Sequence, residues 1–157
     1  MRVQDIMTVS PEVCRPEDNL AEAVSQLWSA DCGVLPIVDH AGRLAGIVTD
    51  RDICIALGTR NERPSAVPVR SVMRSSVETC GPGDDVIAAL ARMAEHQVRR
   101  LPVVDDERRL LGILSLSDAA LATGSGPQAV RPGAVLDTLR SVSRHALPVP
   151  VVAGARD

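Results

Sequence analysis

Two short segments of the chain carry residue types that could bind a ligand. Residues 46–52 and 112–118 share one pattern: a glycine, two apolar residues, a hydroxyl residue, two variable residues and an aspartate. A hydroxyl followed three residues later by a carboxylate is typical of a capping box at a helix N-terminus. The same pair could bind a nucleotide, since the hydroxyl can donate to a phosphate and the carboxylate can accept the ribose hydroxyls. The four residues are Thr49, Asp52, Ser115 and Asp118.

On spacing alone, both interpretations of these segments stay open. Capping boxes are common, whereas the glycine at the start of each segment also lets another backbone or a ligand approach closely. These roles suit a nucleotide better than a metal ion or a covalent nucleophile. The chain has no Ser-His-Asp or Cys-His spacing and no Walker-type phosphate loop. We therefore expect no catalytic residues and no metal site.

The segments recur because the whole chain repeats itself. Pro36 matches Pro102 at an offset of 66 residues, and the offset holds without a gap from Met7 and Met73 onward. Such self-similarity predicts two copies of one structural unit. We place the copies at residues 3–58 and 69–124, joined by a polar, proline-containing linker at 59–68, with a C-terminal region at 125–157.

Each copy is predicted to fold as β-α-β-β-α, an α/β (α+β) arrangement. A short extended piece near residue 14 or 80 precedes an amphipathic helix, for which Asp18 and Asp84 are the predicted N-caps. Two apolar runs then indicate buried strands, and the proline in the first run predicts an edge position or an interruption of the hydrogen-bond ladder. The final helix begins at the hydroxyl residue of the motif. The predicted strands are residues 34–38, 44–49, 100–104 and 110–115.

The C-terminal region and the single aromatic residue complete this organisation. Residues 134–145 have the apolar spacing of a helix, and the proline-containing tail at 146–157 is predicted to be extended. Trp28 belongs to an apolar helical segment, so we expect it to pack in the core or between the domains.

Composition narrows the function classes. The formal net charge is -3, and no apolar run reaches the roughly 20 residues that span a bilayer. The absence of Phe and Tyr disfavours nucleic-acid binding by base stacking. The N-terminus does not show a signal-peptide pattern, so we expect a cytoplasmic protein without a membrane partner. The four cysteines lack metal-ligand spacing, and we expect buried, reduced thiols.

The two L-P-[IV]-V-D strands and the two G-h-h-[ST]-x-x-D segments resemble the CBS domain pair, or Bateman module, over residues 3–122. The resemblance implies tandem repeats packed about a pseudo-two-fold axis that leaves two clefts. In that family the clefts hold AMP, ADP, ATP, S-adenosylmethionine or related adenosyl ligands. It further implies that Asp52 and Asp118 bind the ribose, and that Thr49 and Ser115 meet the phosphate.

The resemblance also points to the positions just before each L-P strand. There the second copy has Arg99 and Arg100, which would reach phosphates, although a pair of solvated surface charges is the alternative. Val98 and Cys32 would contact the base. Thr8 is a further candidate, but its counterpart is Arg74, which argues against a symmetric role.

We therefore expect a regulatory adenine-nucleotide-binding sensor that acts in trans and requires no cofactor besides its adenosyl ligand. Following the family pattern, we expect a homodimer, with an unidentified protein partner downstream. The alternatives are a ligand-free interaction module of the same fold, in which the motif residues only cap helices, and an enzyme or nucleic-acid binder on this scaffold.

Overall fold

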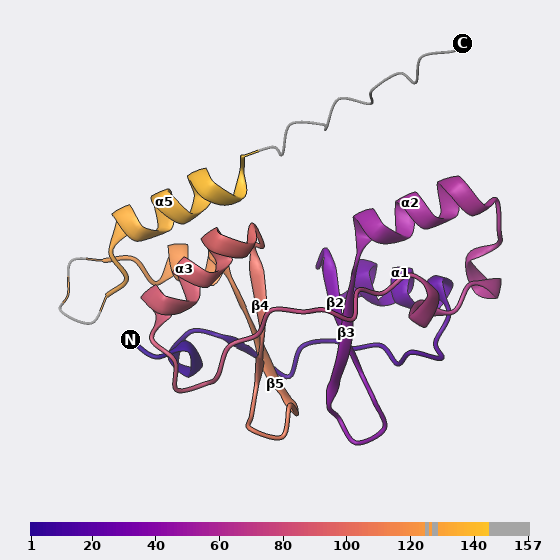
Figure 1. Ribbon diagram of the computed structural model, residues 1–157, viewed down its shortest axis with the longest axis horizontal. Helices are drawn as coiled ribbons and strands as arrows, with labels where there is room; N and C mark the ends of the chain where they lie inside the picture. The colour runs from indigo at the N-terminus through magenta and orange to yellow at the C-terminus, as the bar shows by residue number, and fades with distance from the viewer. Residues whose placement is uncertain (125, 127–128, 145–157) are drawn as a thin grey trace, which may run out of the picture.

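The computed structural model describes residues 1–124, 126 and 129–144. Two α/β units lie side by side, each with a β-hairpin toward the middle of the molecule (Figure 1). The predicted order of elements is confirmed in both copies. The elements are β1 (Thr8–Val9), α1 (Leu20–Ser29), β2 (Val34–Val38), β3 (Leu44–Thr49), α2 (Asp50–Arg60), α3 (Val86–His96), β4 (Arg100–Val104), β5 (Leu110–Ser115), α4 (Leu116–Leu121) and α5 (Pro132–Val142), with 3-10 turns η1 (Val3–Asp5), η2 (Pro64–Ala66) and η3 (Val69–Ser71).

The strands form two small antiparallel sheets, β2-β3 and β1-β5-β4. Pro36 and Pro102 take the same place in the two hairpins, opposite Ile47 and Ile113. Each proline lies on an edge strand, as predicted, and its carbonyl accepts a hydrogen bond from the N–H of Cys14 or Cys80. These single bridges are the short extended pieces expected before each first helix.

Backbone hydrogen bonds join the turns of the two hairpins. The Leu44 N–H donates to the Arg108 carbonyl at 2.9 Å, and the Leu110 N–H donates to the Gly42 carbonyl at 3.1 Å. The two bonds come from equivalent positions in the two copies. They are consistent with the pseudo-two-fold packing that the family resemblance implied.

The predicted helix caps are wrong by one residue. Asp18 accepts the Arg15 N–H at 2.7 Å and so closes the turn before the helix. Asn19 is the N-cap of α1, and its side chain accepts hydrogen bonds from two backbone N–H groups. The Glu22 carboxylate in turn accepts a hydrogen bond from the Asn19 N–H, which completes a capping box. The second copy repeats this shift, with Asp84 in the turn and Asp85 at the cap.

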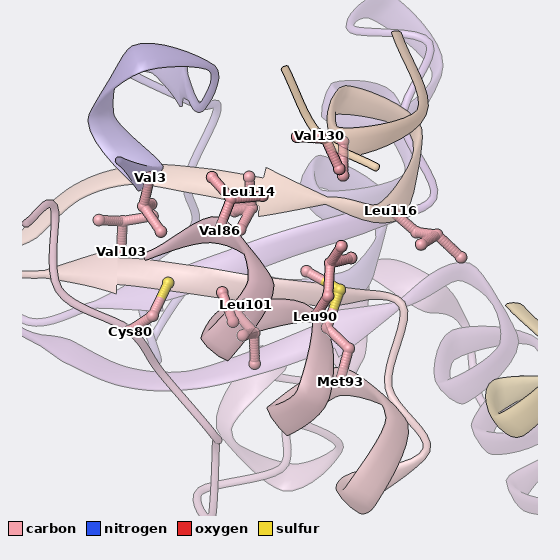
Figure 2. Packing of buried hydrophobic residues seen from close by; sticks show 12 residues of the cluster. Val3, Cys80, Val86, Leu90, Met93, Leu101, Val103, Leu114, Leu116 and Val130 are labelled. Carbon is pink, nitrogen blue, oxygen red and sulfur yellow. The ribbon is translucent and has the colours of Figure 1, made fainter. Parts of the chain in front are cut away.

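Each unit has its own aliphatic core, and each core includes a residue from the start of the other repeat. The second core contains Leu90, Met93 and Leu101, and also Val3 from the N-terminal turn (Figure 2). The first core likewise contains Val69, the residue equivalent to Val3. The packed units therefore do not coincide with the repeats as they run along the sequence.

Helix α5 distinguishes the second unit from the first. It packs over α3 and α4, where Val135 and Val142 contact the second core. The Ser141 hydroxyl donates to the Ala94 carbonyl at 2.9 Å. The helix is shorter than the predicted 134–145, and the tail from residue 145 lies outside the described residues.

The prediction that Trp28 packs in the core or between domains is wrong, because its side chain is 87% exposed. Leu20, Ala23 and Leu27 form the buried stripe of α1. One residue further along, Trp28 is turned about 100° away from Leu27 and faces outward. Trp28 lines an apolar groove of about 590 Å³ between α1 and α2.

The expectation that the four cysteines are buried, reduced thiols is confirmed only in part. Cys14 and Cys80 are buried, Cys32 is half-buried and Cys54 is exposed, and all four are free thiols. Burial raises the pKa of Cys14 to about 12 and that of Cys80 to about 11. None of the described helices is long and apolar enough to cross a membrane.

Candidate functional site

Both motif segments fold as a sharp strand-to-helix turn. Thr49 ends β3 and caps α2, and Ser115 ends β5 and caps α4. In each turn the hydroxyl donates to the aspartate Oδ2 at 2.7 Å and accepts the aspartate N–H at 3.1 Å. The capping-box interpretation is confirmed in both copies. It does not exclude ligand binding, because the box uses only one carboxylate oxygen.

The motif glycine allows a second chain segment to cross the turn. A Cβ on Gly46 would lie 2.7 Å from the Arg74 carbonyl oxygen, and a Cβ on Gly112 would lie 2.7 Å from that of Thr8. Both distances are too short for any side chain. The backbone approach predicted for these glycines is therefore confirmed, and it brings Arg74 and Thr8 next to the two motifs.

The first cleft has a volume of about 630 Å³ and combines residues of both copies. Thr49 comes from the first copy, whereas Val98, Arg99 and Arg100 come from the second. Val34, Ile47 and Val77 give the cleft aliphatic walls. Asp52 lies beside this cleft and is held by Arg74, which lines it.

The second cleft has a volume of about 250 Å³, and here the motif comes from the second copy and the facing residues come from the first. Ser115 and Asp118 come from the second copy, and Thr8 and Cys32 come from the first. Arg100 lines both clefts. All nine candidate residues thus lie at or beside one of two clefts, and each cleft pairs the motif of one copy with the pre-strand segment of the other.

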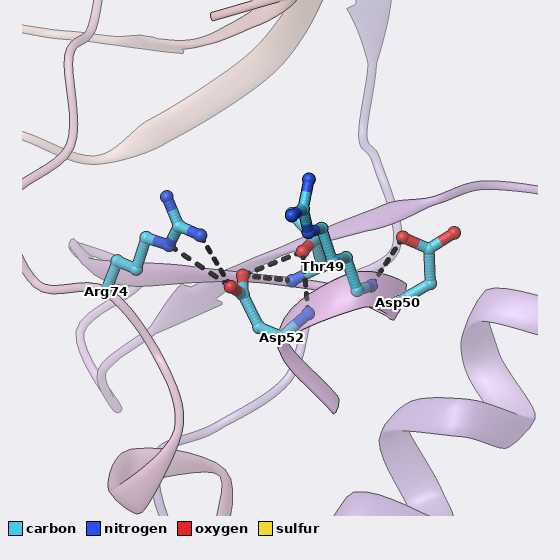
Figure 3. A network of polar contacts seen from close by, with 5 residues as sticks. Thr49, Asp50, Asp52 and Arg74 are labelled. Atoms are coloured by element: carbon cyan, nitrogen blue, oxygen red, sulfur yellow. Dashed lines mark hydrogen bonds and ion pairs between the residues drawn. The ribbon is translucent and has the colours of Figure 1, made fainter. Parts of the chain in front are cut away.

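An ion pair distinguishes the two aspartates. Arg74 donates to Asp52 Oδ1 from Nη2 at 2.6 Å and from Nε at 3.2 Å (Figure 3). The Asp52 side chain is only 10% exposed. Burial of this carboxyl acts to raise its pKa, but the hydrogen bonds from Thr49 and Arg74 and the charge of Arg74 outweigh burial and lower the pKa.

Among the residues that the structure describes, Asp118 has no ion-pair partner. Thr8 occupies the position of Arg74, paired with Ile113 of β5. Within the described part of the chain, no hydrogen bond reaches Asp118 Oδ1. Sequence reasoning did not include Arg74 in the site. The available signal was the mismatch between Thr8 and Arg74 at the 66-residue offset.

Several arginines concentrate positive charge at the first cleft. Arg51, Arg99 and Arg100 line it, and in the described residues none of the three has an ion-pair partner. The Arg99 carbonyl accepts the Leu116 N–H at 2.9 Å, which fixes the backbone next to the second motif. These side chains are available to an anionic ligand.

Acidic side chains also border the first cleft. Asp50 accepts the Arg51 N–H on the far side of the turn from Arg74 (Figure 3), and Glu78 lies 3.7 Å from His96. Among the residues described, no group of three or more His, Cys, Asp or Glu side chains is arranged to hold a metal ion. The geometry therefore suits a ligand with hydroxyl donors, an apolar ring and an anionic group.

Comparison with known proteins gives consistent matches. The sequence matches the family model of the CBS domain over residues 3–59 and again over residues 69–123. It is 36% identical over 119 residues to the CBS domain-containing protein YhcV of Bacillus subtilis, which covers 76% of this chain and 83% of that protein. The inosine-5'-monophosphate dehydrogenase of Methanocaldococcus jannaschii is 35% identical over 129 residues, 82% of this chain but only 24% of the enzyme.

A solved structure shares the fold. The CBS domain pair of protein MJ0100, in complex with 5'-methylthioadenosine and S-adenosyl-L-methionine, aligns with a TM-score of 0.70 and 30% identity. The alignment covers 77% of this chain and 94% of that domain pair.

Proposed function

Because the chain belongs to the CBS domain family, we propose that it is a regulatory module that binds an adenine nucleotide or a related adenosyl ligand, such as AMP, ADP, ATP or S-adenosylmethionine. The observation that carries this proposal is the composition of the clefts. Each joins the hydroxyl residue of one copy's motif to an apolar residue from the other copy, the motif aspartate lies in or beside the cleft, and Arg100 lines both. The adenosyl ligands of the MJ0100 domain pair support the same ligand class here.

Each part of an adenosyl ligand would have a partner in this site. Asp52 and Asp118 would accept ribose hydroxyls, Thr49 and Ser115 would meet a phosphate or its equivalent, and Arg99 or Arg100 would neutralise its charge. Val98 and Cys32 would contact the base. Since the chain has no Phe or Tyr, aliphatic side chains would have to enclose the ring.

We propose that the module acts in trans in the cytoplasm, without catalytic activity of its own. In the dehydrogenase relative the matching region is 24% of a longer enzyme. A module that responds to a ligand needs a different affinity for that ligand in two states, and a protein partner would recognise one of them.

A homodimer is part of this proposal. Val24, Trp28 and Ile55 are exposed on the first unit, and Leu136 and Leu139 are exposed on α5. Such apolar side chains on helices favour association with a second copy. Sedimentation velocity would measure the assembly, and Trp28 fluorescence would shift to shorter wavelength with concentration if the dimer covers its groove. A monomer at all concentrations would contradict the homodimer.

The second candidate is a ligand-free interaction module. The two complete capping boxes favour it, because they account for all four motif side chains without a ligand. Under this alternative, Asp118→Asn would change the stability of the protein and little else. Under the ligand-binding proposal, the same substitution would weaken nucleotide binding in a protein that remains folded.

Calorimetric titration with AMP, ATP, S-adenosylmethionine and NAD tests the proposal. We expect saturable binding of at least one of them, weakened by Asp52→Asn or Asp118→Asn according to the cleft in use. Circular dichroism would verify that the variants are folded, and a product assay would detect turnover. The absence of binding to the folded wild-type protein would support the interaction module instead.

A further inference from the structure

The two clefts differ at one structurally equivalent position. Arg74 pairs with Ile47 through two backbone hydrogen bonds of 3.0 and 2.9 Å, and Thr8 is the antiparallel register partner of the equivalent residue, Ile113. Both residues follow a methionine and both cross the motif glycine at the same distance. The backbone therefore presents the two side chains to equivalent aspartates.

This difference changes which oxygens each aspartate can offer. In the first cleft, Thr49 uses Asp52 Oδ2 and Arg74 uses Oδ1. In the second cleft, the serine uses Asp118 Oδ2, and no hydrogen bond within the described residues reaches Oδ1. Ribose hydroxyls could bind Asp118 directly, whereas at Asp52 they would compete with a guanidinium.

Breaking the Arg74–Asp52 pair leaves a guanidinium that needs a new anionic partner. A neutral nucleoside supplies none, so the lost charge-assisted hydrogen bonds oppose its binding. A phosphate can accept the released guanidinium in a bidentate manner. Arg51 and Arg99 line the first cleft and not the second, whereas Arg100 lines both, and the volume of the first cleft is larger, about 630 Å³ against about 250 Å³.

The acidic groups at the first cleft do not cancel this preference. Asp50 lies on the side of the turn away from Arg74, and Glu78 lies close to His96. A phosphate near Arg74 would therefore be separated from Asp50 by the turn. The second cleft contains Glu12 and has Arg100 as its one arginine among the described residues.

We propose that Arg74 is a specificity-determining residue: it restricts the first cleft to phosphorylated ligands, whereas the second cleft, with Thr8 in the equivalent position, accepts a nucleoside with or without phosphate. This inference rests on the proposed function, because it requires the clefts to bind adenosyl ligands. It goes further in assigning a different ligand class to each cleft and a residue that sets the difference.

Reciprocal substitutions test the assignment. Adenosine, AMP and ATP would be titrated into the wild-type chain, Arg74→Thr and Thr8→Arg, with circular dichroism as the folding control. The wild type is expected to bind adenosine at one site and AMP or ATP at two. Arg74→Thr should tighten adenosine binding at the first cleft at least tenfold, and Thr8→Arg should weaken it at the second cleft by a similar factor.

An Asp118→Asn background isolates the first cleft. There, adenosine binding should be lost while AMP binding remains, and adding Arg74→Thr should restore adenosine. Arg74→Gln, which removes the charge but keeps a longer polar side chain, provides a second variant if Arg74→Thr does not fold.

The outcomes separate this inference from the proposed function. An unchanged ratio of adenosine to AMP affinity in folded Arg74 variants, or equal binding of both compounds at both clefts of the wild type, would overturn the role of Arg74 and leave nucleotide binding in place. No binding of any of the three compounds to any folded variant would overturn both.

Discussion

Asp52 and Asp118 have the same bonds within their own turns but different environments beyond them. Each receives a hydroxyl and a backbone N–H from the residue three positions earlier. In the described part of the chain, only Asp52 of the two also binds a guanidinium, that of Arg74, whose side chain is 66% exposed. The ion pair therefore has one buried and one solvated partner, which limits its contribution to stability.

This pair gives a prediction for stability against pH. The pKa of Asp52 in the folded protein is lowered from its ordinary value of 3.8. The ionised Asp52 carboxylate therefore stabilises the fold fully above pH 3.8, and this stabilisation is lost as the pH falls through the lower, folded-state pKa. Arg74→Gln should reduce the free energy of unfolding at neutral pH by about 1 kcal/mol at most. Urea unfolding should show the difference shrinking as Asp52 becomes protonated.

Arg51→Gln is the matched control for this prediction. Arg51 lies on the same turn, and within the described structure it has no ion pair. Its replacement should change the free energy of unfolding little, both at neutral pH and in acid. A loss in Arg74→Gln that stays the same in acid would show that the Asp52 carboxylate is not involved.

The thiols give a second prediction at the residue scale. Burial raises the pKa of Cys14 to about 12 and that of Cys80 to about 11, and Cys14 donates its thiol hydrogen to Gln26 at 3.0 Å. Thiolates are the reactive form, so both should resist alkylation at mildly alkaline pH. Exposed Cys54 should react first, as mass spectrometry of timed samples would reveal. Rapid labelling of Cys14 in folded protein would contradict this packing.

At the scale of elements, the strand-to-helix turn depends on its glycine. Gly46→Ala or Gly112→Ala would place a Cβ 2.7 Å from a backbone oxygen, which cannot move away as a flexible side chain could. We expect each change to lower the free energy of unfolding by roughly 1–3 kcal/mol. Thermal or urea unfolding would measure the loss.

Gly58 provides the control for the turn glycines. It lies within α2, and a Cβ there would meet nothing within 4 Å. Gly58→Ala should therefore stabilise the protein by up to about 1 kcal/mol through helix propensity. Equal effects of the alanine at positions 46 and 58 would argue against a close crossing at the motif.

At the scale of the whole molecule, the two units depend on each other through exchanged segments. Val3 is completely buried in the second core although it begins the first repeat. Its N–H donates to the Asp84 carbonyl at 2.9 Å, and the equivalent Val69 N–H donates to the Asp18 carbonyl at 2.7 Å. Loss of either segment removes part of the neighbouring core.

Val3→Ala should therefore weaken the second unit. We expect a loss of roughly 2 kcal/mol from the missing methyl groups and the cavity that they leave. Amide hydrogen exchange should show reduced protection in β4 and β5 before β2 and β3. Val9→Ala, at a side chain that is 63% exposed, should change stability by about 0.5 kcal/mol or less. Protection lost mainly from β2 and β3 would contradict the segment exchange.

The repeat, the order of elements and the motif turns could all be predicted from the amino-acid sequence. A constant offset of 66 residues identified the two copies, and Thr49 with Asp52 identified the start of α2. These features are local: a capping box joins residues three apart, and a buried stripe follows the helical period. The one-residue error at Asp18 arose because that side chain caps the preceding turn instead.

How the site is assembled became visible in the folded chain and could not be predicted from the sequence. It placed Val98 and Arg99 with Thr49, put Cys32 and Thr8 with Ser115, and left Trp28 exposed. It also joined Arg74 to Asp52, 22 residues apart. Such contacts depend on how two sheets pack against each other and on which chain segment crosses each glycine. Composition and periodicity along the chain do not predict which segment of one copy contacts the other copy, because the two copies have nearly the same pattern.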